Sequence, residues 1–134
     1  MIYCYYYLPV ATSKEKVWDI LIDKVEHPAT YVSGVEEGEF RSLENGTRQR
    51  GMQRHGLVVK ENIEVNETDR VTRFELEGHP DYEGYIENEV VEENGQTYLR
   101  YELRWEGKNG ERPQEVQRWL DNTVKSTVDM AENS

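Results

Sequence analysis

One acidic residue, Glu61, lies in a stretch of chain that is otherwise suited to a buried strand face. Every second residue from 57 to 65 belongs to one set: Leu57, Val59, Glu61, Ile63 and Val65. A period of two is typical of a strand that buries one side. Because an unpaired carboxylate is costly to bury, Glu61 must find a partner or keep its proton. Glu61 is therefore the first candidate for a catalytic group.

The preceding segment, 47–55, supplies partners for that carboxylate. Every second residue, and therefore one face of the expected strand, includes Arg48, Arg50, Met52 and Arg54. If Arg50 pairs with Glu61, the carboxylate could act as a general base on an acidic C–H bond. Arg50 would then stabilise an enolate or bind a ligand carboxylate. The pair could equally be structural, or Glu61 could face water beside a β-bulge; the sequence leaves these alternatives open.

Further candidate ligand-binding residues have both apolar bulk and a polar group. Along 97–105 one face carries Thr97, Leu99, Tyr101, Leu103 and Trp105. Asn88 shares its parity with Gly84, Ile86 and Val90, and Trp119 lies on the apolar stripe of a C-terminal helix. With Met52, the residues Asn88, Tyr101, Trp105 and Trp119 are expected to line a ligand site. The aromatic residues could instead be plain core, and Asn88 could serve a neighbouring backbone group.

Metal and cofactor chemistry has little support in the sequence. The three histidines, His27, His55 and His79, are far apart and have no spacing typical of a metal site. No glycine-rich phosphate loop or nucleophile elbow is present, so we expect neither metal nor cofactor. Cys4, the single cysteine, is expected to be a buried, unreactive thiol in a reducing compartment.

Length and charge limit the class of protein further. The 134 residues form one domain, 1–134, with a polar tail from about residue 131. The net charge of −11 repels nucleic acid and anionic membranes, so neither is an expected partner. The apolar N-terminal stretch is too short to span a bilayer, and we expect a cytoplasmic protein.

The order of elements predicts an α+β fold. Strands are expected at 2–10, 35–44, 47–55, 57–67, 70–77, 82–93 and 96–106. Thr12 and Glu15 have capping-box spacing, which predicts a helix over 13–24, and a second short helix should run from 27–28 to about 33–34. A C-terminal helix of about 20 residues follows Pro113 and is long enough to cross a whole sheet. Seven antiparallel strands beneath it would form a curved sheet with a cavity.

One face of the first strand indicates a surface for self-association. Tyr3, Tyr5 and Tyr7 alternate on the side opposite its apolar residues. Such a row could bury against a second subunit and form a homodimer. It could equally pack on the arginines and acids of neighbouring strands.

The entry to the first helix, VATSKEKVW at 10–18, resembles the START/Bet v 1-like (SRPBCC) superfamily. More specifically, the chain is similar to the AtaL-like family in segments 24–28, 31–35, 59–63 and 84–88. The resemblance implies a helix-grip fold around a hydrophobic cavity. It implies no single reaction, since relatives include lipid carriers, hormone receptors, polyketide cyclases and chaperone activators.

These observations favour binding of a small hydrophobic or aromatic ligand between the sheet and the C-terminal helix. The first alternative is a polyketide cyclase or dehydratase that uses Glu61 and Arg50. The second is a protein-interaction module of the chaperone-activator type.

Overall fold

A computed structural model describes the backbone of residues 1–31, 35–42, 48–54 and 57–133, and the side chains of 1–31, 48–51 and 59–133. The elements in chain order are β1 (Ile2–Val10), α1 (Lys14–Glu26), the 3₁₀ turn η1 (Pro28–Thr30), β2 (Val35–Ser42), β3 (Arg48–Arg54), β4 (Leu57–Asn66), β5 (Val71–Glu77), β6 (Tyr82–Glu93), β7 (Gln96–Gly107) and α2 (Pro113–Glu132).

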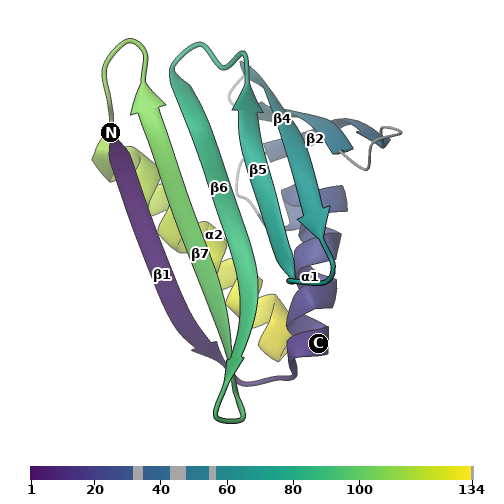
Figure 1. The fold of residues 1–134 in the computed structure, drawn as a ribbon. Coiled ribbons are helices and arrows are strands. Elements are labelled where there is room, and N and C mark those ends of the chain that lie inside the picture. Colours follow the sequence, from purple (N-terminus) through teal and green to yellow (C-terminus); the bar gives the residue numbers. More distant parts are fainter. Residues whose placement is uncertain (32–34, 43–47, 55–56, 134) are drawn as a thin grey trace.

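The strands form one antiparallel sheet with the order β1-β7-β6-β5-β4-β3-β2. Both helices lie on the same side of it, with the yellow α2 behind β7 and the purple α1 behind β4 and β5 (Figure 1). The predicted α+β architecture, with a long C-terminal helix across a curved antiparallel sheet, is confirmed. Neither helix, within the described residues, is long and apolar enough to cross a lipid bilayer.

The start of α1 differs from the prediction by one residue. Ser13, not Thr12, is the N-cap: its backbone is extended (φ −74°, ψ 155°) and its hydroxyl accepts a hydrogen bond from the Lys16 amide at 3.2 Å. The Thr12 amide instead donates to the Val10 carbonyl in the preceding turn, at 2.9 Å. The predicted capping box is therefore wrong, because the chain still turns at Thr12.

The end of α1 is set by Pro28, since a residue before proline disfavours helical backbone. The second short helix predicted after it is shorter than expected. It is the three-residue turn η1, and the rest of the predicted span, 32–34, lies outside the described residues.

The apolar stripe predicted for the C-terminal helix lies on the inward side of α2, and six of its eight members are buried; the stripe comprises Val116, Trp119, Leu120, Thr123, Val124, Thr127, Val128 and Ala131. Its buried residues are Val116, Leu120, Thr123, Val124, Thr127 and Ala131. Thr123 and Thr127 donate their hydroxyl protons to carbonyls one turn earlier, at 3.1 and 2.9 Å, so these polar groups cost little inside the core. The stripe packs with Val17, Leu21 and Val25 of α1 in one hydrophobic core.

The strand register aligns the inward-facing side chains in rows across the sheet. One row runs from Tyr6 through Tyr101 and Asn88 to Thr72. Thr97, Leu99, Tyr101 and Leu103 are all buried, which confirms the predicted inward face of β7 over these positions. Gly84 lies opposite Trp105, with φ +133° and space for no side chain: a Cβ there would lie 2.0 Å from the Arg104 carbonyl oxygen.

Candidate functional site

Five polar side chains from five different elements meet inside the fold, between the sheet and α1. These residues, here termed the buried polar cluster, are Lys24, Arg50, Glu61, Asn88 and Tyr101. Each is at most 7% exposed. Two of the side chains are basic and one is acidic. Residues of this kind are seldom fully buried unless they are paired, so the contacts of each one matter.

The predicted partnership of Arg50 and Glu61 is present. The two residues are opposite each other in β3 and β4, and Arg50 Nε donates to Glu61 Oε1 at 2.8 Å. Arg50 Nη1 also donates to the carbonyls of Lys24 and Val25, at 2.8 and 3.0 Å. These carbonyls belong to the last turn of α1, where no further helical amides can reach them. Arg50 therefore attaches the end of α1 to the sheet, so a structural role for the pair is directly visible.

Of the other arginines considered as partners, Arg48 is opposite Ile63 and not Glu61. The side chain of Arg54 lies outside the described residues.

Lys24 is the member that sequence reasoning missed. Its amino group donates to Asn88 Oδ1 at 2.6 Å and to the Tyr101 hydroxyl at 2.8 Å. It also lies 4.3 and 5.5 Å from the ring centres of Tyr101 and Phe74. A signal was present: Lys24 follows Val17 by seven residues and Leu21 by three, which places it on the buried stripe of α1.

The electrostatics of the cluster favour a neutral amine at Lys24. Burial is the main cause that holds the pKa of Lys24 well below its usual value; Arg50 lowers it further, and Glu61 opposes both. Burial likewise raises the pKa of the Tyr101 hydroxyl, which keeps its proton. Arg50 is matched by Glu61, whereas the partners of Lys24 within the described part of the chain are neutral groups.

Several buried donors on the same inner face have no hydrogen-bond partner among the described residues. They are Asn88 Nδ2, Trp105 Nε1 and the Thr72 hydroxyl. Asn88 and Thr72 are each 0% exposed and are opposite each other in the register. A buried donor without an acceptor costs about 1–3 kcal/mol, so these groups are suited to meeting acceptor atoms.

The remaining predicted ligand-binding residues form a separate group. Trp105 lies four residues beyond Tyr101 on β7, about 13 Å along the strand. Its ring stacks on Trp119 of α2, with 5.9 Å between ring centres, and contacts Tyr82 at 5.2 Å. The structure therefore brings Glu61, Arg50, Asn88 and Tyr101 together but sets the two tryptophans apart from them. Met52 lies in β3 opposite Val59, and its side chain is outside the described residues.

Two other residues considered in the sequence, His79 and Cys4, have contacts that indicate structural roles. His79 Nδ1 accepts hydrogen bonds from the amides of Asp81 and Tyr82 at 3.0 and 3.2 Å, which fixes the loop before β6. Cys4 faces the core opposite Leu103 but is only partly buried, so the prediction of a fully buried thiol is wrong. Burial still raises its pKa, which disfavours the reactive thiolate.

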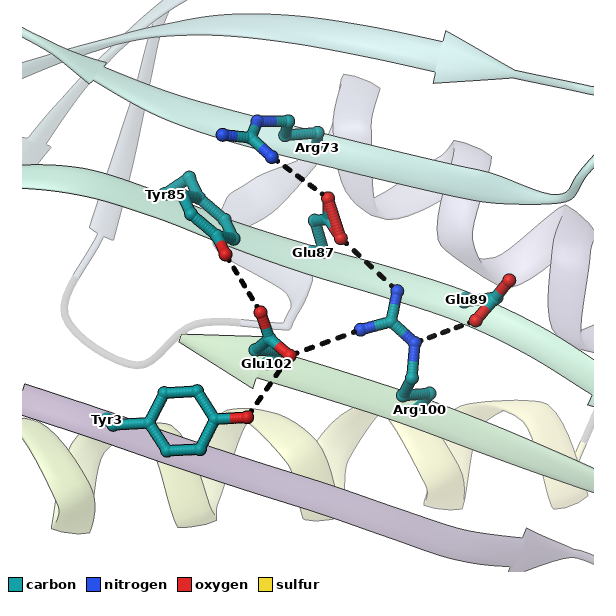
Figure 2. Close-up of polar contacts among 7 residues, drawn as sticks. All are labelled: Tyr3, Arg73, Tyr85, Glu87, Glu89, Arg100 and Glu102. Atoms are coloured by element: carbon teal, nitrogen blue, oxygen red, sulfur yellow. Dashed lines mark hydrogen bonds and ion pairs between the residues drawn. The ribbon is translucent and has the colours of Figure 1, made fainter. Parts of the chain in front are cut away.

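The opposite face of the sheet carries a network of charged and phenolic side chains (Figure 2). Arg100 at its centre pairs with Glu87, Glu89 and Glu102 at 3.3, 2.7 and 3.6 Å. Tyr3 donates to Glu102 at 3.3 Å, so this tyrosine packs on neighbouring charged residues as one alternative expected. Tyr3 and Tyr5 are still 47% and 49% exposed.

A surface hollow borders this outer network and not the buried polar cluster. Its volume is about 720 Å³, and its lining includes Arg73, Glu87 and Arg100. Arg73 and Arg100 both pair with Glu87, so the charges there compensate one another. We place the candidate site on the inner face because charged and polar side chains from five elements converge there and are almost fully buried.

Comparisons with known proteins show the fold. No protein-family model matches the chain. No curated protein sequence matches it either. Among solved structures, the Zhui aromatase/cyclase from Streptomyces sp. R1128 has a TM-score of 0.69 at 13% identity, over 98% of this chain and 91% of that one.

Two further solved structures extend this likeness. Ara h 8.0201 has a TM-score of 0.68 at 12% identity, with coverage of 98% and 94% of the two chains. A START superfamily protein from Mycobacterium smegmatis has a TM-score of 0.64 at 15% identity, with coverage of 98% and 94%. The chain thus shares the fold of START and Bet v 1-like proteins, as the resemblance at residues 10–18 predicted. The finer resemblance to the AtaL-like family stays a prediction.

Proposed function

We propose that this protein, which has the START and Bet v 1-like fold, binds a small hydrophobic or aromatic molecule between the sheet and the helices α1 and α2. The buried polar cluster orients the polar group of that molecule. Around it, the inner face offers apolar surface from residues such as Phe74, Ile86 and Leu99. Apolar walls with a few convergent polar groups are the usual composition of a small-molecule site.

One observation carries the proposal: Lys24, Asn88 and Tyr101 converge beside the Arg50–Glu61 pair in an interior whose other large buried side chains are mostly apolar. Burying such groups costs several kcal/mol, and hydrophobic side chains of similar volume would often stabilise the fold as well or better. A binding role explains why a chain would retain this arrangement. The unpartnered Asn88 Nδ2 supports the same role, because a ligand oxygen would satisfy it.

Native mass spectrometry of the purified protein tests the proposal. We expect a mass excess under native conditions that disappears on denaturation, and a released molecule with an apolar ring or chain. The control is Arg100→Gln, which alters the outer network only and should retain the molecule. Asn88→Leu, of similar volume, should lose it. Equal occupancy in both variants, or no retained molecule and no binding of aromatic probes, would contradict the proposal.

The second candidate is a polyketide cyclase or dehydratase activity. It is favoured by the buried Glu61 at 2.8 Å from Arg50, the arrangement expected for a base beside an enolate-stabilising cation. Glu61→Gln keeps the volume and removes the base, so it should abolish turnover of a polyketide-like substrate while retaining binding. Unchanged turnover would remove Glu61 from this role.

A chaperone-activator type of interaction module has less support. Such a module needs a continuous exposed apolar patch. The large hydrophobic residues exposed in the described part of the chain are Met1, Tyr3, Tyr5 and Met130. Two of these lie on β1 and Met130 lies near the end of α2. The buried polar cluster is therefore the better-supported site.

A further inference from the structure

The charges of the buried polar cluster do not balance. Arg50 and Glu61 form a pair at 2.8 Å, and Lys24 is a second basic group beside them. The groups that face its amine are Arg50 from β3, Glu61 from β4 and the neutral Tyr101 hydroxyl from β7. Nearby, Tyr6 of β1 donates to Asp121 of α2, so those two groups are occupied with each other. Protonation of Lys24 would thus leave one positive charge uncompensated.

The hydrogen bonds around Lys24 also leave nearby donors unused. Asn88 uses its Oδ1 to accept from Lys24, which leaves the Nδ2 donor without an acceptor among the described residues. Thr72, opposite it in β5, has a hydroxyl in the same condition. The Asn88 amide and the Thr72 hydroxyl can therefore each donate a further hydrogen bond here. A carboxylate or enolate has only acceptor sites, so its chemistry complements that of the cluster.

We propose that the ligand is a small organic anion, an apolar ring or chain that carries a carboxylate or enolate, and that Lys24 gains a proton as it binds. An oxygen of the anion accepts from Lys24 Nζ and from Asn88 Nδ2. The inference rests on the proposed function and names the ligand class for the same site.

Proton uptake follows from the surroundings of the amine. In the free protein, burial and the neighbouring Arg50 favour the uncharged form of Lys24. A bound anion within hydrogen-bond distance favours the ammonium form, because opposite charges attract strongly where the dielectric constant is low. Since a carboxylate ligand is already ionised at neutral pH, the proton must come from the buffer. A neutral ligand of the same shape gives no such uptake.

Isothermal titration calorimetry with matched probes tests this inference. The probes are 2-naphthoate and 2-naphthamide, which differ in charge and little in shape. Titrations at pH 8 in buffers of different ionisation enthalpy give the number of protons taken up. We expect 2-naphthoate to bind at least tenfold more tightly than the amide and to take up protons on binding, at most one per molecule bound. Lys24→Met should remove both the preference and the uptake.

Two controls separate binding from folding and from a general effect of replacing a lysine. The thermal unfolding of Lys24→Met shows whether the variant is folded. Lys125→Met makes the same substitution at an exposed position of α2 and should behave as the wild type. If both probes bind with equal affinity, or if 2-naphthoate binds without proton uptake, this inference is wrong while the proposed function stands. If Lys24→Met keeps the anion preference, Lys24 is not the group responsible. If neither probe binds, the proposed function is contradicted as well.

Discussion

Replacing Lys24 by methionine should change how the stability of the fold depends on pH. In the unfolded chain this lysine titrates near its ordinary pKa of about 10.4. In the folded protein its pKa is well below that value, chiefly because the amine is buried. Between the two pKa values the unfolded state binds one more proton than the folded state. Wild-type stability therefore rises with pH across this window, because the cost of removing the proton from Lys24 diminishes.

The expected size follows from linkage. One proton difference corresponds to about 1.4 kcal/mol in the free energy of unfolding for each pH unit. Lys24→Met has no such group, so its advantage over the wild type should be largest at low pH. This advantage should shrink as the pH rises through the window between the folded-state and unfolded-state pKa values, by about 1.4 kcal/mol for each pH unit of that window. The methionine side chain is also well suited to filling the apolar surroundings of Phe74 and Tyr101.

Urea denaturation followed by tryptophan fluorescence at several pH values measures this difference. Lys125→Met, exposed on α2, is the matched control and should shift the unfolding curve by a constant amount at every pH. A difference between the wild type and Lys24→Met that does not vary with pH would refute the reasoning. It would mean that Lys24 stays protonated in the folded protein.

Three further substitutions test the structural account. Arg50→Met should lower the free energy of unfolding by about 3–5 kcal/mol, because it leaves the Glu61 carboxylate buried without its arginine partner. Denaturant titration measures this loss, and a loss below about 1 kcal/mol would contradict the prediction. Gly84→Ala should destabilise the fold by more than about 2 kcal/mol, since a Cβ would lie 2.0 Å from the Arg104 carbonyl oxygen; an unchanged midpoint of thermal unfolding would argue against this geometry. Ser13→Ala should cost about 1 kcal/mol in denaturant titration through loss of the helix cap, whereas a neutral outcome would favour the cap that the sequence had predicted one residue earlier.

The fold was predictable because its signals are local. The alternation along 97–105 and the apolar stripe of α2 each depend on residues close in sequence, and the structure has both. The first helix was placed correctly, although its cap was assigned to Thr12 when Ser13 performs that role. Thr12 has Glu15 three residues later, whereas Ser13 has Lys16, so the capping-box pattern favoured the residue that does not cap the helix.

The candidate site was predictable in part. The alternation of residues along the predicted strands indicated that Glu61, Arg50, Asn88 and Tyr101 face inward. In the structure these four residues lie together in the buried polar cluster. Lys24 was missed because a basic residue in the last turn of a helix is ordinarily explained by the helix dipole and by solvent.

Parity also could not show which inward residues lie near one another. Trp105 shares a face with Tyr101, but it pairs with Trp119 about four residues further along the strand. Which residues meet is decided by the register of several strands and by the position of α1, both of which depend on contacts between distant parts of the chain.

Chemical-shift mapping by NMR with 2-naphthoate tests most directly whether the buried polar cluster is the ligand site. The side-chain amide of Asn88 is the reporter, because its Nδ2 is fully buried and has no acceptor among the described residues. Its resonances can be assigned by their disappearance in Asn88→Leu. Our account predicts that they shift on titration with 2-naphthoate, together with the backbone amides of Lys24 and Tyr101. Shifts confined to the outer hollow around Arg73, Glu87 and Arg100, with the Asn88 side chain unmoved, would contradict it.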